Sequence, residues 1–219
     1  MFDRVARRYD LANHVLSAGC DFWWRAQASE IVGSWCAPCV LDVATGSGDL
    51  ALCLQRKLPQ SKITAVDFSR RMVAIARRKG LRDVVVADAL RLPFAAQSFD
   101  VVTVAFGLRN MRDWSGGLRE MRRVLTSSGR LLILDFSLPR NALLRKTYGF
   151  YLHQILPLFC RLITSEKEAY EYLGTSIETF PNGSEMCRLI ESNGFSRATA
   201  EPLTGGIVTI YTAAAGSIS

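Results

Sequence analysis

Hydrophobic residues fall into short continuous runs that alternate with amphipathic stretches between residues 40 and 136. The first run, Val40–Val43, is typical of a strand buried in a parallel sheet, and helical spacing resumes over Leu50–Leu54. Similar runs follow at Ile63–Asp67, Val84–Asp88, Phe99–Ala105 and Arg130–Phe136. Because strands alternate with helices, the pattern predicts a parallel sheet that is covered by helices on both faces.

Turn residues set the expected ends of the later elements. A helix is predicted over Asp113–Leu125, with a helix-ending turn at Ser127–Gly129. Phe195–Glu201 and Ile207–Thr212 are predicted strands, and the short link between them suits an antiparallel pair. We therefore predict an α/β, Rossmann-like fold with a seven-stranded, mostly parallel sheet and an antiparallel C-terminal strand.

Two segments are expected to lie outside this sheet. Residues 1–35 predict an N-terminal helical cap, and residues 140–194 predict a helical insertion over the substrate site. Insertions of this kind commonly carry specificity. The chain has 219 residues, of which 49% are hydrophobic, so it can bury a full core, and we expect one domain over residues 1–219.

The turn after the first predicted strand indicates a nucleotide ligand. Gly46 and Gly48 let the backbone approach a ligand closely, and their spacing to Ala51 also satisfies the loose dinucleotide pattern. Asp42 and Asp49, however, place carboxylates on both sides of the turn, which disfavours a pyrophosphate and favours a cation. S-Adenosylmethionine (SAM) carries an ammonium and a sulfonium and no phosphate, so it suits this turn better than NAD.

Two further acids end the next predicted strands. Asp67 can accept both hydroxyls of a ribose, and Asp88 can accept from an adenine amino group while Ala89 leaves room for the ring. Each acid alone is more simply explained as a helix cap or a turn residue. Their shared position at successive strand ends favours one extended ligand.

The formal net charge of +7 suits nucleic acid or an anionic membrane, although solvated helix faces explain the basic clusters equally well. One cluster, Arg140, Arg145 and Lys146, adjoins the apolar stretch Leu143–Ile163. A basic rim on an apolar segment suits a membrane surface, and the alternative is a helix that covers the sheet.

The sequence also carries information on the cellular location of the protein and on its cysteines and metal sites. No signal peptide and no bilayer-spanning run is evident, which predicts a cytoplasmic protein, at most peripheral at the inner face of the membrane. The cysteines are scattered, so reduced thiols are expected, and Cys36 and Cys39 precede a strand where a redox pair would follow one. No metal site is predicted.

Several motifs stand in a recognisable order along the chain. They are Met1–Ala6, Leu41–Leu50, Asp67–Ser69, Ala87–Ala89, Phe106–Asn110 and Leu203–Ile207. In these motifs the chain resembles, over essentially its whole length, the bacterial quinone C-methyltransferases of menaquinone and ubiquinone biosynthesis. Phe106–Asn110 and Leu203–Ile207 are the most specific to that family.

The resemblance implies a class I SAM methyltransferase that methylates a ring carbon of a prenylated quinol. Demethylmenaquinol is the preferred substrate, and the ubiquinone-pathway benzoquinol is the other. The family's cofactor contacts fall on Asp67, Phe68, Asp88, Ala89, Ser47 and Ala105. Ser47 replaces a usual threonine and keeps a hydroxyl, whereas Ala105 stands where many members have serine and offers no hydrogen bond.

A ring carbon attacks a methyl group well only when the neighbouring hydroxyl loses its proton, so the site needs a base or a group that stabilises the anion. Arg109 is expected to stabilise the quinolate and to orient a proton-accepting water, and the alternative for it is a structural ion pair. Tyr9 is expected to contact the quinol hydroxyl, and His153 is a further candidate base.

Other functions stay open at this point. A nucleic-acid or other small-molecule methyltransferase is one alternative, but Ala105–Leu108 replaces the Asn/Asp-Pro-Pro-aromatic loop typical of amino-group methylation, so no nucleic-acid partner is expected. A SAM-binding assembly subunit without catalysis is another. The sequence does not decide between a monomer and a homodimer.

Overall fold

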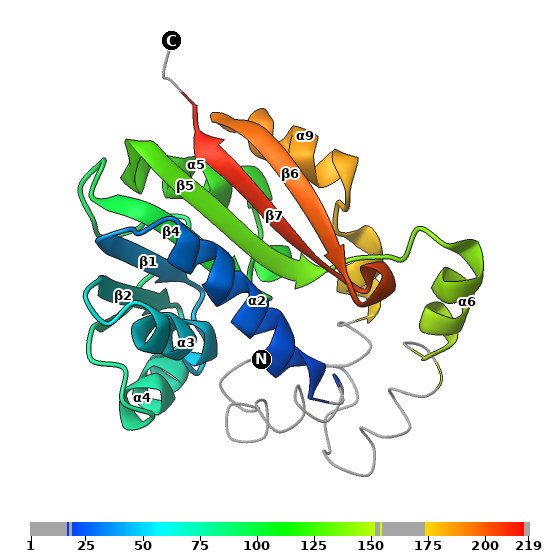
Figure 1. The fold of residues 1–219 in the computed structure, drawn as a ribbon, viewed down its shortest axis with the longest axis horizontal. Coiled ribbons are helices and arrows are strands. Elements are labelled where there is room, and N and C mark those ends of the chain that lie inside the picture. The colour runs from blue at the N-terminus through cyan, green and yellow to red at the C-terminus, as the bar shows by residue number, and fades with distance from the viewer. Residues whose placement is uncertain (1–16, 18, 152–153, 155–173, 217–219) are drawn as a thin grey trace.

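The computed structural model describes residues 17, 19–151, 154 and 174–216. Its centre is a seven-stranded sheet in the order β3-β2-β1-β4-β5-β7-β6 (Figure 1). The strands are β1 (Cys39–Val43), β2 (Lys62–Asp67), β3 (Val84–Val86), β4 (Phe99–Ala105), β5 (Leu125–Phe136), β6 (Phe195–Leu203) and β7 (Val208–Ala215). β7 runs antiparallel to both β5 and β6, and the other pairs are parallel, which confirms the predicted fold.

Helices cover both faces of this sheet, as the alternating pattern predicts. α2 (Cys20–Ser34), α3 (Asp49–Lys57) and α4 (Arg70–Arg78) pack on one face, and α5 (Trp114–Val124) and α9 (Ser184–Glu191) pack on the other (Figure 1). Successive residues of a strand point to opposite faces. Accordingly, Leu132 and Leu134 of β5 join the core beneath α2 and α3, while Leu131 and Ile133 join the core beneath α5.

The predicted turn at Ser127–Gly129 is wrong. α5 ends at Val124, and β5 begins at the next residue and continues through Gly129. Leu125 is fully buried and pairs with Phe99, and a shift of register between Phe99 and Val101 absorbs the polar residues that suggested a turn. Burial of one leucine therefore outweighs the local turn signal.

The third predicted strand is shorter than expected. β3 ends at Val86, and Asp88 lies in a turn where it forms an isolated bridge with Arg91. The Asp88 carboxylate accepts a hydrogen bond from the Leu90 amide at 2.9 Å, which closes this turn and takes the chain away from the sheet.

The two predicted helical segments are described in part. Within 1–35 the structure gives α2, and within 140–194 it gives α6 (Ala142–Phe150), a helical stretch at 174–179 and α9. Two short 3-10 helices, η1 (Leu108–Asn110) and η3 (Thr204–Gly206), follow β4 and β6. Among the helices in the described ranges, none has the length and apolarity that a bilayer span requires.

Candidate active site

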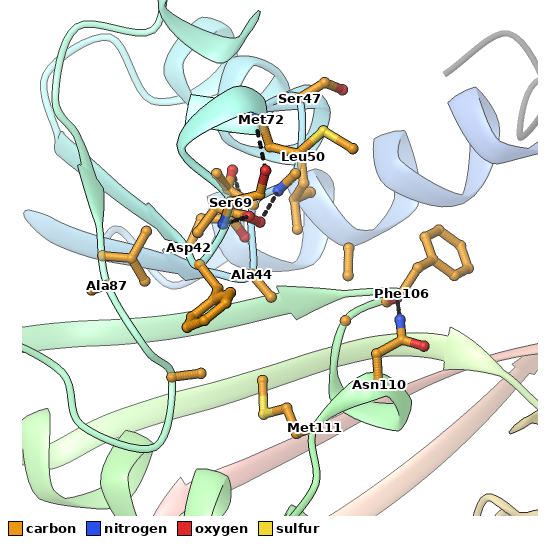
Figure 2. A pocket seen from close by; sticks show the side chains of 18 of the residues that line it. Asp42, Ala44, Ser47, Leu50, Ser69, Met72, Ala87, Phe106, Asn110 and Met111 are labelled. Carbon is orange, nitrogen blue, oxygen red and sulfur yellow. Dashed lines mark hydrogen bonds between the residues drawn. The ribbon is translucent and has the colours of Figure 1, made fainter. Parts of the chain in front are cut away.

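A cavity of about 420 Å³ opens at the carboxyl ends of β1, β2, β3 and β4, and Figure 2 shows part of its lining. Because these strands are parallel, their ends meet at one edge of the sheet. β1 has β2 on one side and β4 on the other, and ligands bind at such switch points of open α/β sheets. The predicted cofactor residues that line the cavity are Asp42, Gly46, Ser47, Asp67, Phe68, Asp88, Ala89 and Ala105.

Gly48 is not among the lining residues. A Cβ added to Gly48 would lie 3.1 Å from the Cβ of Ala76 and 3.3 Å from a methyl group of Leu81, so this glycine lets the loop pack against α4. A Cβ added to Gly46 would meet no heavy atom within 4 Å. Gly46 therefore faces the open space of the cavity, and Gly48 serves the packing behind it.

Asp42 lies at the floor of the site. The residue is 1% exposed, and its carboxylate accepts hydrogen bonds from the hydroxyls of Thr45 and Thr103, both at 2.6 Å. Burial raises the pKa of Asp42 to about 6, and the two hydroxyls and the charge of Arg25 limit this rise. The acid thus connects the glycine loop after β1 with the neighbouring strand β4.

Asp67 fixes the loop from the other side. One oxygen of its carboxylate accepts from the Gly46 amide at 2.8 Å, and the other accepts from the Ser69 amide at 2.8 Å. Ser69 in turn caps α4 by accepting from the Met72 amide, a contact drawn in Figure 2. Phe68, between the two, is 78% exposed beside the cavity.

Asp49 is paired within the protein. Its carboxylate lies 2.8 Å from Nζ of Lys79, which also donates to the Ser47 hydroxyl at 3.0 Å. The charge of Asp49 is therefore compensated, and the prediction that it attracts a cationic ligand loses force.

The turn after β4 forms the far wall of the cavity. Phe106 adopts a left-handed backbone conformation with φ 57°, and its carbonyl accepts from the Asn110 side chain at 3.2 Å (Figure 2). Gly107 allows this turn to lie against the glycine loop, because an added Cβ would come within 2.6 Å of the Ala44 Cβ. The absence of a side chain at Gly107 thus permits the close contact between the two loops.

Arg109 lies behind this wall and does not line the cavity. Its Nη1 atom donates to the Asp135 carboxylate at 2.7 Å and to the Phe106 carbonyl at 2.7 Å, and its guanidinium stands 5.0 Å from the centre of the Phe136 ring. The Arg109 and Asp135 side chains are 4% and 0% exposed. Burial raises the pKa of Asp135, and the Arg109 charge opposes this rise. This geometry is that of the ion-pair alternative. Tyr9 and His153 lie outside the described residues.

Several lining residues were missed in the sequence. They are Arg25, Ala44, Thr45, Leu50, Val66, Ser69, Met72, Ala87, Leu90, Phe106, Gly107, Asn110, Met111 and Arg112. Phe106 and Asn110 belong to a motif that the resemblance had singled out, so this motif was the available signal. Arg25 carries no such signal, because only the packing of α2 brings it to the cavity.

A comparison with known families decides the assignment. Residues 1–215 match the model of the ubiE/COQ5 methyltransferase family. The chain belongs to this family. A demethylmenaquinone methyltransferase of Thermus thermophilus is 41% identical, over 96% of this chain and 98% of that protein. A protein of Geobacter sulfurreducens named ubiquinone/menaquinone biosynthesis C-methyltransferase UbiE is 43% identical, over 99% of this chain and 87% of that protein.

Solved structures show the fold of the ubiE/COQ5 chain independently. A SAM-dependent methyltransferase from Thermotoga maritima superposes with a TM-score of 0.66 at 18% identity, over 98% of this chain and 100% of that one. Human N-acetylserotonin methyltransferase, solved in complex with SAM, gives a TM-score of 0.59 at 20% identity, over 88% and 56% of the two chains. The family and fold make this chain a SAM-dependent methyltransferase, which confirms the predicted enzyme class and cofactor.

The buried carboxylate of Asp42 makes stability depend on pH. Its pKa is about 6 in the folded protein against 3.8 as the ordinary value, so ionisation favours the unfolded chain. We expect Asp42 to lower the free energy of unfolding by about 3 kcal/mol between about pH 4 and about pH 7, with the loss ending just above the folded pKa. Urea unfolding of the wild type and of Asp42→Asn across this range measures the effect. Parallel curves for the two proteins would contradict it.

Proposed function

We propose that this chain transfers the methyl group of SAM to a ring carbon of a prenylated quinol, with demethylmenaquinol as the preferred substrate. The proposal rests on the relative from Thermus thermophilus, which bears the name demethylmenaquinone methyltransferase and aligns with nearly the whole chain. A further relative with this name, from a Mycobacterium species, is 42% identical over 97% of the chain. The ubiquinone-pathway benzoquinol is the second candidate, because the Geobacter relative's name covers both quinones.

The residues at the cavity fit SAM. When bound, SAM supplies an electrophilic methyl group on a sulfonium. Asp67, already fixed by two backbone amides, would accept the ribose hydroxyls, and Asp88 would accept from the adenine amino group beside Ala89. The open space beside Gly46 leaves room for the amino-acid end of SAM. The carboxylate of Asp42 attracts the positive charges of SAM.

On the acceptor side, the chain must lower the cost of a quinolate. Arg109 remains our candidate for this task, because Asp135 and the Phe106 carbonyl fix its guanidinium directly behind the cavity wall. Tyr148 of α6 lies within electrostatic reach of it: burial raises the pKa of Tyr148, Tyr151 raises it further, and Arg109 lowers it. Tyr9, as a contact to the quinol hydroxyl, and His153, as a base, remain candidates from the sequence.

The substrate is tested by methyl transfer from labelled SAM. Reduced demethylmenaquinone and the reduced demethylated ubiquinone precursor are supplied separately, with the unreduced quinones as controls. We expect product from reduced demethylmenaquinone and none from the unreduced form, because only a quinol can give the anion. SAM binding without product on either quinol would move the assignment to another acceptor or to a non-catalytic subunit.

The role of Arg109 is tested against its structural alternative. Removal of one partner of a buried ion pair costs about 3–5 kcal/mol, so Arg109→Gln alone destabilises the protein whether or not it is catalytic. The double variant Arg109→Gln/Asp135→Asn removes both charges and should recover most of this stability. We expect its turnover to stay at least about 100-fold low, with SAM affinity nearly unchanged. Recovery of turnover together with stability would make Arg109 purely structural.

We also propose that α6 contacts the membrane in which a prenylated quinol resides. Leu143 and Phe150 are 74% and 60% exposed, and Arg145 and Lys146 are exposed on the same short helix. Apolar side chains with a basic rim favour an anionic lipid surface. Figure 1 shows α6 set apart from the sheet.

Membrane contact is measured by sedimentation with phosphatidylglycerol vesicles. We expect Leu143→Gln/Lys146→Gln to weaken binding at least about tenfold, because both an apolar side chain and a basic one are lost. Arg78→Gln, an exposed basic residue on α4, is the matched control and should bind as the wild type does. Equal binding by all three proteins would exclude α6 as the contact.

A further inference from the structure

The acids that line the cavity complement the positive charges of SAM but not its negative charge. Its amino-acid end carries an α-carboxylate as well as an α-ammonium, and the lining acids Asp42, Asp67 and Asp88 repel a carboxylate. An anion in such a place needs a fixed cation or several N–H donors. The lining supplies two cationic side chains, Arg25 and Arg112.

Arg25 is held in a defined position. It lies on α2, where its guanidinium pairs with the Asp21 carboxylate, and the two side chains are 11% and 4% exposed. Asp21 also accepts from the Ser17 hydroxyl at 2.7 Å. On its other side, the guanidinium stands 5.2 Å from the centre of the Phe106 ring, in the far wall of the cavity.

The field of Arg25 reaches the glycine loop and the start of α3. Burial raises the pKa of Asp42, and the Arg25 charge is among the groups that limit this rise. Burial likewise raises the pKa of Cys53 on α3, and the charges of Arg56 and then Arg25 oppose it. The Arg25 charge therefore acts on both Asp42 and α3, in keeping with its place beside Asp42 in the cavity lining.

The start of α3 favours an anion as well. Helix α3 begins after Gly48, which offers no side chain to cap the first amides, and Leu50 in its first turn lines the cavity. The dipole of a helix N-terminus attracts negative charge, and the acid in the first turn, Asp49, is paired with Lys79. The Arg25 guanidinium and the first turn of α3 thus line one and the same cavity.

Arg25 also retains donors. Within the described part of the chain, both hydrogen bonds that it donates leave from Nη1 and go to Asp21. A guanidinium has five N–H donors in a rigid fork, so Nε and Nη2 remain for a ligand. Arg112, in contrast, is exposed and follows η1, so nothing comparable fixes it.

We propose that Arg25 binds the α-carboxylate of SAM, in a subsite that it shares with the N-terminus of α3. Asp21 acts as the positioning residue that holds the guanidinium. The proposal rests on the SAM-dependent activity and is independent of the methyl acceptor, so it can fail while the quinol assignment stands, and the reverse.

The test compares ligands that differ only in the carboxylate. S-Adenosylhomocysteine and its decarboxylated analogue are titrated by calorimetry into the wild type and into Asp21→Asn/Arg25→Gln, which removes both charges and leaves no buried acid unpaired. We expect the wild type to prefer the carboxylate ligand by about 10- to 100-fold, the range for a charge-assisted hydrogen bond. In the double variant this preference should fall to less than about threefold.

Two controls decide between recognition and structure. 5′-Methylthioadenosine lacks the amino-acid end, so its affinity should be the same for the wild type and the double variant. Arg112→Gln removes the other lining cation and tests the rival assignment: loss of the carboxylate preference in this variant would give the subsite to Arg112 and overturn the proposal. The proposal is overturned if the double variant retains the preference for the carboxylate. It is also overturned if the affinity of the double variant for 5′-methylthioadenosine falls as much as its affinity for S-adenosylhomocysteine. The single variant Arg25→Lys, which keeps the charge beside Asp21, should show an intermediate preference.

Discussion

The buried carboxylate of Asp42 is the constraint on which the rest of the site depends. It is the last residue but one of β1 and accepts from Thr45 in the glycine loop and from Thr103 on β4, each at 2.6 Å. If either strand moved, a nearly dehydrated acid would lose its hydrogen bonds, which is costly. The loop, the strand beside it and the floor of the cavity are therefore held in one arrangement before any ligand arrives.

At the end of β2, Asp67 likewise combines a structural role with a place at the cavity. Asp67 accepts from the Gly46 and Ser69 amides, so the acid proposed to hold a ribose also shapes the loop and starts the next helix. Each carboxylate oxygen has more than one lone pair, so a structural bond and a ligand bond are compatible. A site that is ordered before the ligand arrives loses little conformational entropy when the ligand binds.

Much of the fold could be predicted because the strands that build it are continuous apolar runs at regular spacing. Asp67 and Asp88 could be placed at the cavity because parallel strands bring their carboxyl ends to one edge. The start of β5 could not, since the burial of Leu125 against Phe99 is a tertiary contact that no local pattern contains. Arg25 was missed for the same reason: its place depends on how α2 packs.

Arg109 shows a different limit of the sequence. Its motif marks it as special, but a motif does not say whether a guanidinium faces a ligand or a buried acid. Here Nη1 of Arg109 donates a hydrogen bond to the carboxylate of Asp135, which lies on β5 and is distant in the sequence. Only the register of β4 against β5 brings the two together, and a single chain read by itself does not reveal that register.

Two arginine–aspartate pairs stand on either side of one aromatic cluster. Arg25 lies over Phe106 and Arg109 lies over Phe136, and the two rings are 4.9 Å apart. Each guanidinium has its own acid, Asp21 or Asp135, which offsets much of its positive charge. An uncompensated arginine would repel the sulfonium and the ammonium of SAM. Pairing Arg25 with Asp21 therefore lets the protein place rigid N–H donors beside a cationic cofactor with little repulsion of its positive charges.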